Sequence, residues 1–556
     1  MLTAVFQLLG NSELAALRLA AREFVSAASA AVTSLKPTSI AANLRPFGQL
    51  QALDLSGLRP DEWQEEMLAV FPKAGLTSLT LSKPTYLSLA GTEAIADLQC
   101  LRSMHIMEAP ILDSVLQPLS RLSGLQHLSL RDCCKLSDEG LKVIAHMTCL
   151  ESLDLSMVWQ LTDATLAMLA DSLTCLARLD LTSCERFTAA GLRRLCKLSS
   201  LKTLLMPACY QLTDECLEVV AGGMKQLRCL GLFEAGENVT DAGLLKLSSL
   251  SQLTALDLGY SCWGHSAQGL KQLLPRLKGL QMLNLGGCEG ACDAVLSAVA
   301  GLRQLTQLDV SECQRVTTRA IQQLARLPQL ASLNLGWNLK LSAAALAGFA
   351  DSGSLLTQLD LSFCGEMGDE ALGMLGALPK LKALCLRKCT RVGDKGLAHL
   401  GHCTSLEQLD LSYCPLITPE GLRHIASQLP LLGALRLMDC PRAVTVLGMR
   451  ALGSAERLQS LHVGDNKRLD DGCMQAISFM SQLRSLVVRA CPKITDHGLL
   501  ALARITHLRD LDIDLCVAVT PAGVAKLQAK LPLLKRLRPS RGSMMSQLQA
   551  SNSRLL

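Results

Sequence analysis

Cysteine offers more reactive chemistry than any other residue type in this sequence, because 23 of the 556 residues are cysteines. Many of them follow a leucine by five positions, as Cys414 follows Leu409 in the phrase LDLSYCPLITPEGL. A thiolate can act as a nucleophile, form a disulfide or bind zinc. The cysteines at this repeated position are Cys133, Cys184, Cys209, Cys288, Cys313, Cys364, Cys389, Cys414, Cys440, Cys491 and Cys516.

Two further phrases place an asparagine, Asn338 or Asn466, at the same position. Asparagine can neither form a disulfide nor act as a thiolate, so the position does not require that chemistry. Cysteine and asparagine share small size and the ability to hydrogen-bond, which suits a turn whose backbone groups would otherwise be buried unpaired. We therefore predict that these residues form a structural ladder, one in each layer of a repeat structure.

The phrase HLGHC, which contains His399, His402 and Cys403, superficially suggests a metal site. It falls at a predicted helix end and turn, without a second pair of ligands nearby in the sequence, so we expect no metal there. The sequence contains no glycine-rich phosphate loop, zinc-protease helix motif or nucleophile elbow. We therefore predict a protein that is not an enzyme and that needs no cofactor.

The elements that position these residues recur with a period of about 25 residues. A Leu-x-Leu core predicts a short strand with two leucines facing inward. Nine or ten residues later, a pair such as Thr162-Asp163, Thr213-Asp214, Thr495-Asp496 or Thr418-Pro419 predicts a helix start. The cores begin at Leu53, Leu79, Met104, Leu128, Leu153, Leu179, Leu204, Leu230, Leu256, Leu283, Leu308, Leu333, Leu359, Leu384, Leu409, Leu435, Leu461, Leu486 and Leu511.

Parallel strands stack at about 4.8 Å, whereas helices need about 10 Å, so the strands should lie on the inner, concave face. The sequence predicts an α/β fold over residues 48–538, a solenoid of about 19 repeats curved as a horseshoe or nearly closed ring. The phrases LDLSFCGEMGDEAL and LSLRDCCKLSDEGL resemble the cysteine-containing leucine-rich-repeat family. This resemblance implies a scaffold that binds other proteins.

A scaffold of this kind would bind a partner through exposed positions of its concave strands. Between the two leucines stands an aspartate in many repeats, for which we expect mainly a solubilising, strand-end role. Three or four positions after the first leucine, aromatic residues and arginine gather as they do in binding hot spots. We predict a partner surface of Phe233, Tyr260, Trp337, Phe363, Arg387, Lys388, Tyr413 and Arg436. The alternative is that some of these aromatics only cover a neighbouring loop.

Residues 1–47 precede the repeats and contain two predicted short helices. The stretch with Val5, Phe6, Leu9, Leu14 and Phe24 resembles the latter part of an F-box, although the opening Leu-Pro-x-Glu segment is missing and a phenylalanine replaces the usual tryptophan. The resemblance implies that these residues bind the Skp-type adaptor of a cullin-based ligase. The chain would then be the substrate receptor of an SCF-type ubiquitin ligase that feeds proteasomal degradation. The alternatives are a helical cap on the first repeat and a leucine-rich-repeat scaffold with no ligase link.

Charge and composition restrict the partners further. The formal net charge is +5 and no long basic block occurs, so we predict no nucleic-acid partner. We find no run of 18 apolar residues and expect no membrane association. We recognise no secretion signal, and so many cysteines favour a reducing compartment, the cytoplasm or nucleus. Residues 539–556 lose the period and turn polar, which predicts a flexible tail.

Overall fold

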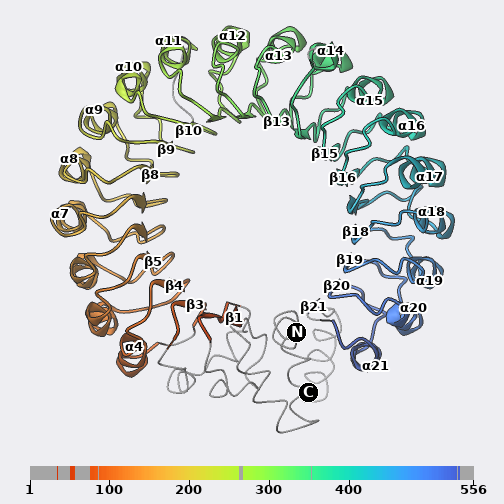
Figure 1. The fold of residues 1–556 in the computed structure, drawn as a ribbon, viewed down its shortest axis with the longest axis horizontal. Coiled ribbons are helices and arrows are strands. Elements are labelled where there is room, and N and C mark those ends of the chain that lie inside the picture. The colour runs from red at the N-terminus through yellow and green to blue at the C-terminus, as the bar shows by residue number, and fades with distance from the viewer. Residues whose placement is uncertain are drawn as a thin grey trace, which may run out of the picture. The chain divides into compact units, whose positions relative to one another are not determined.

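The computed structural model describes residues 34–35, 50–56, 75–84, 87–261, 267–351, 353–534 and 536–538. The chain divides into two compact units, Met1–Gly290 and Ala291–Leu556. Within each unit, parallel strands alternate with helices, and the strands lie on the concave side with the helices on the convex side, as predicted (Figure 1). In this described part of the chain, no helix is long and apolar enough to cross a membrane.

The strands of the first unit are β1 (Ser34–Leu35), β2 (Ala52–Asp54), β3 (Ser78–Ser82), β4 (Ser103–Met107), β5 (His127–Ser129), β6 (Ser152–Asp154), β7 (Arg178–Asp180), β8 (Thr203–Leu205), β9 (Cys229–Gly231), β10 (Ala255–Asp257) and β11 (Met282–Asn284). Its α-helices and short 3-10 helices (η) are α4 (Leu89–Ala96), α5 (Asp113–Leu116), η3 (Gln117–Arg121), α6 (Asp138–Leu141), η4 (Lys142–His146), α7 (Asp163–Ser172), α8 (Ala189–Leu195), α9 (Asp214–Gly223), α10 (Asp241–Lys246), η5 (Leu247–Ser249), α11 (Gln268–Leu273) and η6 (Leu274–Arg276).

The strands of the second unit are β12 (Gln307–Asp309), β13 (Ser332–Asn334), β14 (Gln358–Asp360), β15 (Ala383–Cys385), β16 (Gln408–Asp410), β17 (Ala434–Arg436), β18 (Ser460–His462), β19 (Ser485–Val487), β20 (Asp510–Asp512) and β21 (Arg536–Arg538). Its helices are α12 (Asp293–Val299), α13 (Thr318–Leu324), η7 (Ala343–Leu346), α14 (Ala347–Asp351), α15 (Asp369–Leu375), α16 (Asp394–Leu400), α17 (Pro419–Gln428), α18 (Val446–Leu452), α19 (Asp471–Ile477), α20 (Asp496–Ala501), η8 (Leu502–Arg504) and α21 (Pro521–Lys530).

The strands pair so that the core leucines of successive repeats lie side by side. Leu384 of β15 is opposite Leu409 of β16, which is opposite Leu435 of β17. All three side chains are buried, whereas the residues flanking them on each strand are half-buried or exposed. The prediction that the Leu-x-Leu cores are short strands with their leucines facing inward is therefore confirmed.

The predicted cysteine ladder links many of the repeats to the repeat before them. The Sγ atom of Cys414 donates a hydrogen bond to the carbonyl oxygen of Leu386, at 3.3 Å. In other repeats the Nδ2 atom of Asn338 and the Oγ atom of Ser261 make the equivalent bond, at 2.8 Å and 2.9 Å. The structural role is therefore confirmed, and serine is a third residue type at the position, which the sequence analysis did not include.

We expect the ladder thiols to resist alkylation, because burial raises the pKa of Cys133 and of Cys440 to about 12. At pH 8 a thiol with that pKa is ionised in only about one molecule in ten thousand. Iodoacetamide should therefore modify the exposed Cys100, Cys149 and Cys175 in the native protein and reach the ladder only after urea is added. Peptide-resolved mass spectrometry measures both, and rapid labelling of the ladder in the native protein would contradict the structural role.

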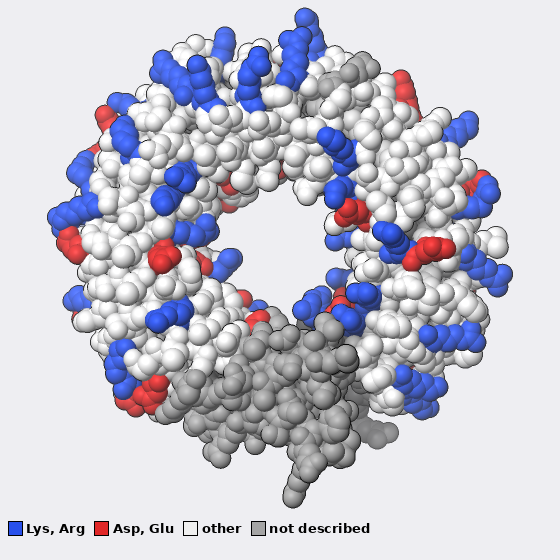
Figure 2. Space-filling view, in the orientation of Figure 1, with Lys and Arg blue, Asp and Glu red and all other residues white. Residues whose placement is uncertain are grey.

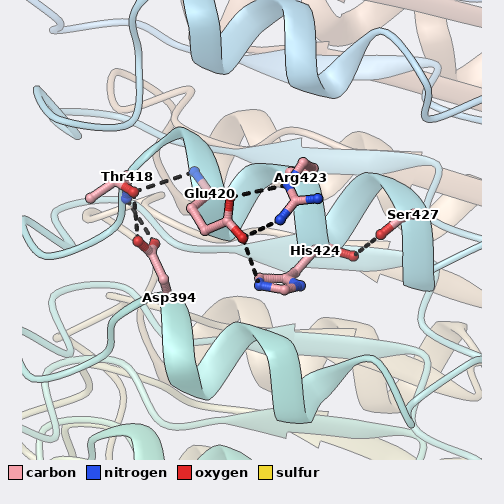
Figure 3. Close-up of polar contacts among 6 residues, drawn as sticks. All are labelled: Asp394, Thr418, Glu420, Arg423, His424 and Ser427. Atoms are coloured by element: carbon pink, nitrogen blue, oxygen red, sulfur yellow. Dashed lines mark hydrogen bonds and ion pairs between the residues drawn. The ribbon is translucent and has the colours of Figure 1, made fainter.

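A second link joins neighbouring repeats at the helix N-termini. The Oγ1 atom of Thr418 accepts a hydrogen bond from the backbone N–H of Glu420, at 3.3 Å, and so caps α17. The backbone N–H and hydroxyl of the same threonine donate to the two carboxylate oxygens of Asp394, the first residue of α16, at 2.9 Å and 2.5 Å (Figure 3). We call this arrangement the threonine–aspartate bridge. It recurs, with serine in one case, in the pairs Asp113–Ser137, Asp138–Thr162, Asp163–Thr188, Asp214–Thr240, Asp293–Thr317, Asp471–Thr495 and Asp496–Thr520.

The predicted helix starts are confirmed, since α7, α9, α17 and α20 begin directly after Thr162, Thr213, Thr418 and Thr495. The sheet also includes β1, which pairs with β2 and lies ahead of the predicted first repeat. Apart from these two residues, the segment before residue 50 lies outside the described residues, as does the predicted tail over 539–556. The predicted domain boundaries therefore stay predictions.

Candidate functional site

Every strand from β3 to β20 leads into a turn that contains a residue in the left-handed backbone conformation. The φ angle is +62° at Trp337, +59° at Phe363 and +62° at Tyr413. A side chain in this conformation costs roughly 1 kcal/mol. The turn is nevertheless hydrogen-bonded to the next repeat through its backbone, because the backbone N–H of Tyr413 donates to the carbonyl oxygen of Met438, at 2.7 Å. The fold thus presents one variable side chain per repeat along the edge of the sheet.

Where the residue between the two core leucines is aspartate or asparagine, its side chain holds this turn in place. The Oδ1 atom of Asp410 accepts a hydrogen bond from the backbone N–H of Ser412, at 2.9 Å. Asn334 does the same for Gly336, at 3.0 Å, so an amide serves as well as a carboxylate. The strand-end role expected for these aspartates is confirmed, and the second oxygen of each carboxylate is left for other contacts.

In the second unit, the turns of four successive repeats bring five of the predicted residues together. The rings of Trp337 and Phe363 are stacked, with centroids 3.7 Å apart and an interplanar angle of 10°. The Nζ atom of Lys388 lies 5.1 Å from the centroid of the Phe363 ring, and the Cζ atom of Arg387 lies 4.9 Å from that of Tyr413. These distances are typical of cation–π contacts. We call these five residues the aromatic ridge.

The other three predicted residues lie apart from the aromatic ridge. Phe233 and Tyr260 form a tilted pair in the first unit, with ring centroids 5.3 Å apart. Arg436 stands on strand β17 itself, where its guanidinium lies 3.8 Å from the carboxylate of Asp410. The eight residues therefore form a ridge, a separate aromatic pair and an arginine on the strand face.

Two exposed aromatics of the first unit were not predicted from the sequence. Trp159 and Tyr210 are 50% and 53% exposed. They follow their core leucines by six positions, whereas the predicted partner surface used residues one, three or four positions after the first leucine. Desolvation and the nearby carboxylate of Glu234 raise the pKa of the Tyr210 hydroxyl. The scarcity of aromatics could have identified both residues. The chain has only 17 aromatic residues, so each one that stands outside the leucine pattern is a candidate for a binding surface.

Beside the aromatic ridge, the strand face of the second unit carries a groove of about 510 Å³. Each ridge residue follows, by two or three residues, a strand that lines the groove, so the ridge runs along one side of it. The groove is lined by Asp309, Ser332, Leu333, Asn334, Gln358, Leu359, Asp360, Ala383, Leu384, Cys385, Gln408, Leu409, Asp410, Ala434, Arg436 and Ser460.

The side chains that line the groove can contact a ligand, but none of these lining residues is an activated nucleophile. Burial, with the neighbouring carboxylate of Asp360, raises the pKa of Cys385 to about 12, so the thiol stays protonated at neutral pH. Cys403 of the HLGHC phrase is buried and donates to the carbonyl oxygen of Leu375, at 3.0 Å. Among the residues that the structure describes, no group of three His, Cys, Asp or Glu side chains could hold a metal ion. The arrangement suits binding.

The F-box-like residues Val5, Phe6, Leu9, Leu14 and Phe24 lie outside the described residues. Their predicted contact with an adaptor therefore stays a prediction.

Parallel Leu-x-Leu strands, a cysteine ladder and a helix in nearly every repeat define the chain as a leucine-rich-repeat solenoid. The family model described as "Leucine Rich repeat" matches residues 124–145, 354–376 and 402–426. Among solved structures, TLR13 in its complex with ssRNA13 is 17% identical, with a TM-score of 0.52 over 89% of this chain and 71% of that one. Mouse RP105, solved with MD-1, is 15% identical, with a TM-score of 0.46 over 80% of each chain.

A curated relative from Caenorhabditis elegans, named "Putative RNA-binding protein EEED8.10", is 33% identical over 138 residues. That match covers 24% of this chain and 19% of the relative, so the chain spans about a fifth of the length of the curated protein it matches. The likeness to the TLR13 structure supports the fold alone.

Proposed function

We propose that this chain is a non-enzymatic binding module that captures a polypeptide on the aromatic ridge and the adjoining groove of its second unit. The observation that carries the proposal is the ridge itself, where aromatic and cationic side chains from four successive repeats contact one another beside a groove. Aromatic and arginine side chains dominate the energetics of protein interfaces. The left-handed turns fix the backbone beneath them, which lowers the entropy lost on binding.

The chemistry of the groove supports binding over catalysis. The Oδ1 atoms of Asp360 and Asp410 are committed to their own turns. The thiol of Cys385 is protonated at neutral pH. The lining side chains therefore offer hydrogen bonds and charge to a partner. The test is capture of polypeptides by the full chain and by its Trp337→Ala, Tyr413→Ala variant in parallel, and equal capture by both would contradict the proposal.

We further propose that the module is the substrate-recognition subunit of an SCF-type ubiquitin ligase, in the cytoplasm or nucleus. The support is the F-box resemblance of the N-terminal stretch, through Phe6 and Leu9 among others. The alternative is a leucine-rich-repeat scaffold or regulator with no ligase link.

Co-expression with a Skp-type adaptor and a cullin separates these alternatives. We expect the full chain, with any upstream coding sequence restored, to retain the adaptor through an affinity purification. A Phe6→Asp, Leu9→Asp variant should lose the adaptor, because charged side chains cannot fill an apolar interface. Tyr413→Ala, far along the chain, should retain it. Failure of the unaltered chain to retain the adaptor would favour the scaffold.

A further inference from the structure

The unpartnered strand face that forms the groove has a charge opposite to that of the whole chain. Its lining contains three carboxylates, on Asp309, Asp360 and Asp410, against the single guanidinium of Arg436. At the left-handed position and the position before it, in the turns that follow β12 to β17, the charged residues are Glu312, Arg387, Lys388 and Asp439, and their formal charges cancel. The chain as a whole has a formal net charge of +5, and side chains of both signs stand on the helix-bearing side of each unit (Figure 2). The groove therefore favours a cationic occupant.

The three carboxylates stand on alternate strands, and the side chains at the same position on the strands between them are uncharged. Asp309 is on β12, Asp360 on β14 and Asp410 on β16. Between them, Asn334 on β13 donates to the Oδ2 atom of Asp309 at 2.6 Å, and Cys385 stands on β15. Neither intervening side chain is positively charged at neutral pH, so neither neutralises Asp360. Asp410 is already paired with the guanidinium of Arg436, at 3.8 Å, so Asp309 and Asp360 are the carboxylates left for a cationic occupant.

The spacing of the carboxylates identifies the shape of the occupant. Neighbouring parallel strands are about 4.8 Å apart, so carboxylates on alternate strands are roughly 10 Å apart. An extended or polyproline-II polypeptide advances about 3.1–3.4 Å per residue, and three residues therefore span roughly 9–10 Å. A peptide that crosses the strands would bring every third side chain to a carboxylate.

We infer that the groove binds an extended segment of a partner protein with lysine or arginine at every third position. This inference rests on the proposed function and specifies its ligand. The aromatic ridge runs beside the same strands, so the residues between the basic positions can contact Trp337 and Phe363. A nucleic acid, whose backbone is negative, does not fit this charge pattern.

The carboxylates can be neutralised without disturbing the turns. Asn284 and Asn334 occupy the same position in their own repeats and accept the same backbone hydrogen bond, at 2.9 Å and 3.0 Å. An Asp309→Asn, Asp360→Asn double variant should therefore keep both turn hydrogen bonds and lose two negative charges, together with the hydrogen bond that the Oδ2 atom of Asp309 accepts from Asn334. Asp154→Asn is the matched control, because Asp154 holds the equivalent turn in the first unit, outside the groove.

The experiment uses the full chain and fluorescein-labelled synthetic peptides in fluorescence anisotropy at about 150 mM salt. One peptide has lysine at every third position in a Pro/Ala/Ser background, one has the same composition with the lysines contiguous, and one has glutamate in place of lysine. We expect the spaced lysine peptide to bind about fivefold more tightly than its contiguous isomer, and the glutamate peptide not to bind. The double variant should weaken binding of the spaced peptide about fivefold, and Asp154→Asn should leave it unchanged.

Three results would overturn the inference: equal binding of the two lysine peptides, equal loss in the double variant and the Asp154→Asn control, or displacement of the spaced peptide by single-stranded RNA. A failure of this inference can be distinguished from a failure of the proposed function. If the Trp337→Ala, Tyr413→Ala variant loses the cellular partner while Asp309→Asn, Asp360→Asn captures it as before, the binding module stands and the basic ligand is wrong.

Discussion

Changing Trp337 and Tyr413 together to alanine is expected to lower the affinity of the chain for its main polypeptide partner by about a hundredfold, or roughly 3 kcal/mol. Trp337 is 45% exposed and stacks on Phe363, so its loss removes exposed contact area and frees the neighbouring ring. Loss of Tyr413 removes the ring that Arg387 covers. Both ends of the aromatic ridge are therefore altered in one variant.

The same variant should keep its melting temperature within a few degrees, since alanine is compatible with the turn. Ala208 and Ala490 occupy the equivalent position in two other repeats, with φ angles of +51° and +55°. Phe479→Ala is a matched control, because Phe479 is 68% exposed and lies under the Arg504 guanidinium in a similar cation–π contact near the end of α19. Affinity capture followed by titration with the purified partner measures the effect. If the control weakens binding as much as the double variant, the surface lies elsewhere.

The second large effect is expected for stability, at the threonine–aspartate bridge. A methyl group added at Gly421 would overlap the Oδ1 atom of Asp394 and lie 2.8 Å from the Cδ1 atom of Leu397. Asp394 cannot move aside without losing its two hydrogen bonds from Thr418. We expect Gly421→Ala to lower the free energy of unfolding by about 2–4 kcal/mol, through overpacking and the loss of charge-assisted hydrogen bonds.

Gly373 supplies a control of the opposite sign. It lies within α15, and a methyl group added there would meet nothing within 4 Å. Gly373→Ala should therefore raise stability by about 0.5–1 kcal/mol, because alanine loses less backbone entropy in a helix. The urea midpoint, followed by circular dichroism, measures both variants. A urea midpoint for Gly421→Ala that equals or exceeds that of the unaltered chain would contradict the role of the bridge in holding the repeats together.

The fold could be predicted from local patterns because the residues that determine the strand, turn and helix of a repeat all lie within about 25 positions of one another. The buried Leu384 and Leu409, the cap at Thr418 and the ladder position of Cys414 are all readable from spacing alone. The threonine–aspartate bridge could not be predicted from spacing, because Asp394 and Thr418 belong to different repeats. Each of these residues is also explained by the start of its own helix. The left-handed turn was also hidden, because residues as different as tryptophan, lysine and alanine occupy it instead of glycine.

The candidate site was predicted only in part, because it too depends on contacts between different repeats. The sequence predicted Trp337, Phe363 and Tyr413 as exposed aromatics, whereas only Trp337 is exposed and the other two are half-buried. Their contacts depend on how the turns of successive repeats align. Arg436 was grouped with them although it follows its leucine by one position and therefore stands on the strand. The groove could not be predicted, since its lining comes from strands of several successive repeats, from Asp309 to Ser460.

Photo-cross-linking from the aromatic ridge tests the central claim most directly. The full chain would be expressed in cells with Tyr413→p-benzoylphenylalanine, and a parallel chain with Phe479→p-benzoylphenylalanine, then irradiated and purified under denaturing conditions. We predict a covalent adduct with the polypeptide partner from position 413 and none from position 479. An adduct from position 479 without one from position 413 would contradict the assignment of the binding surface to the ridge.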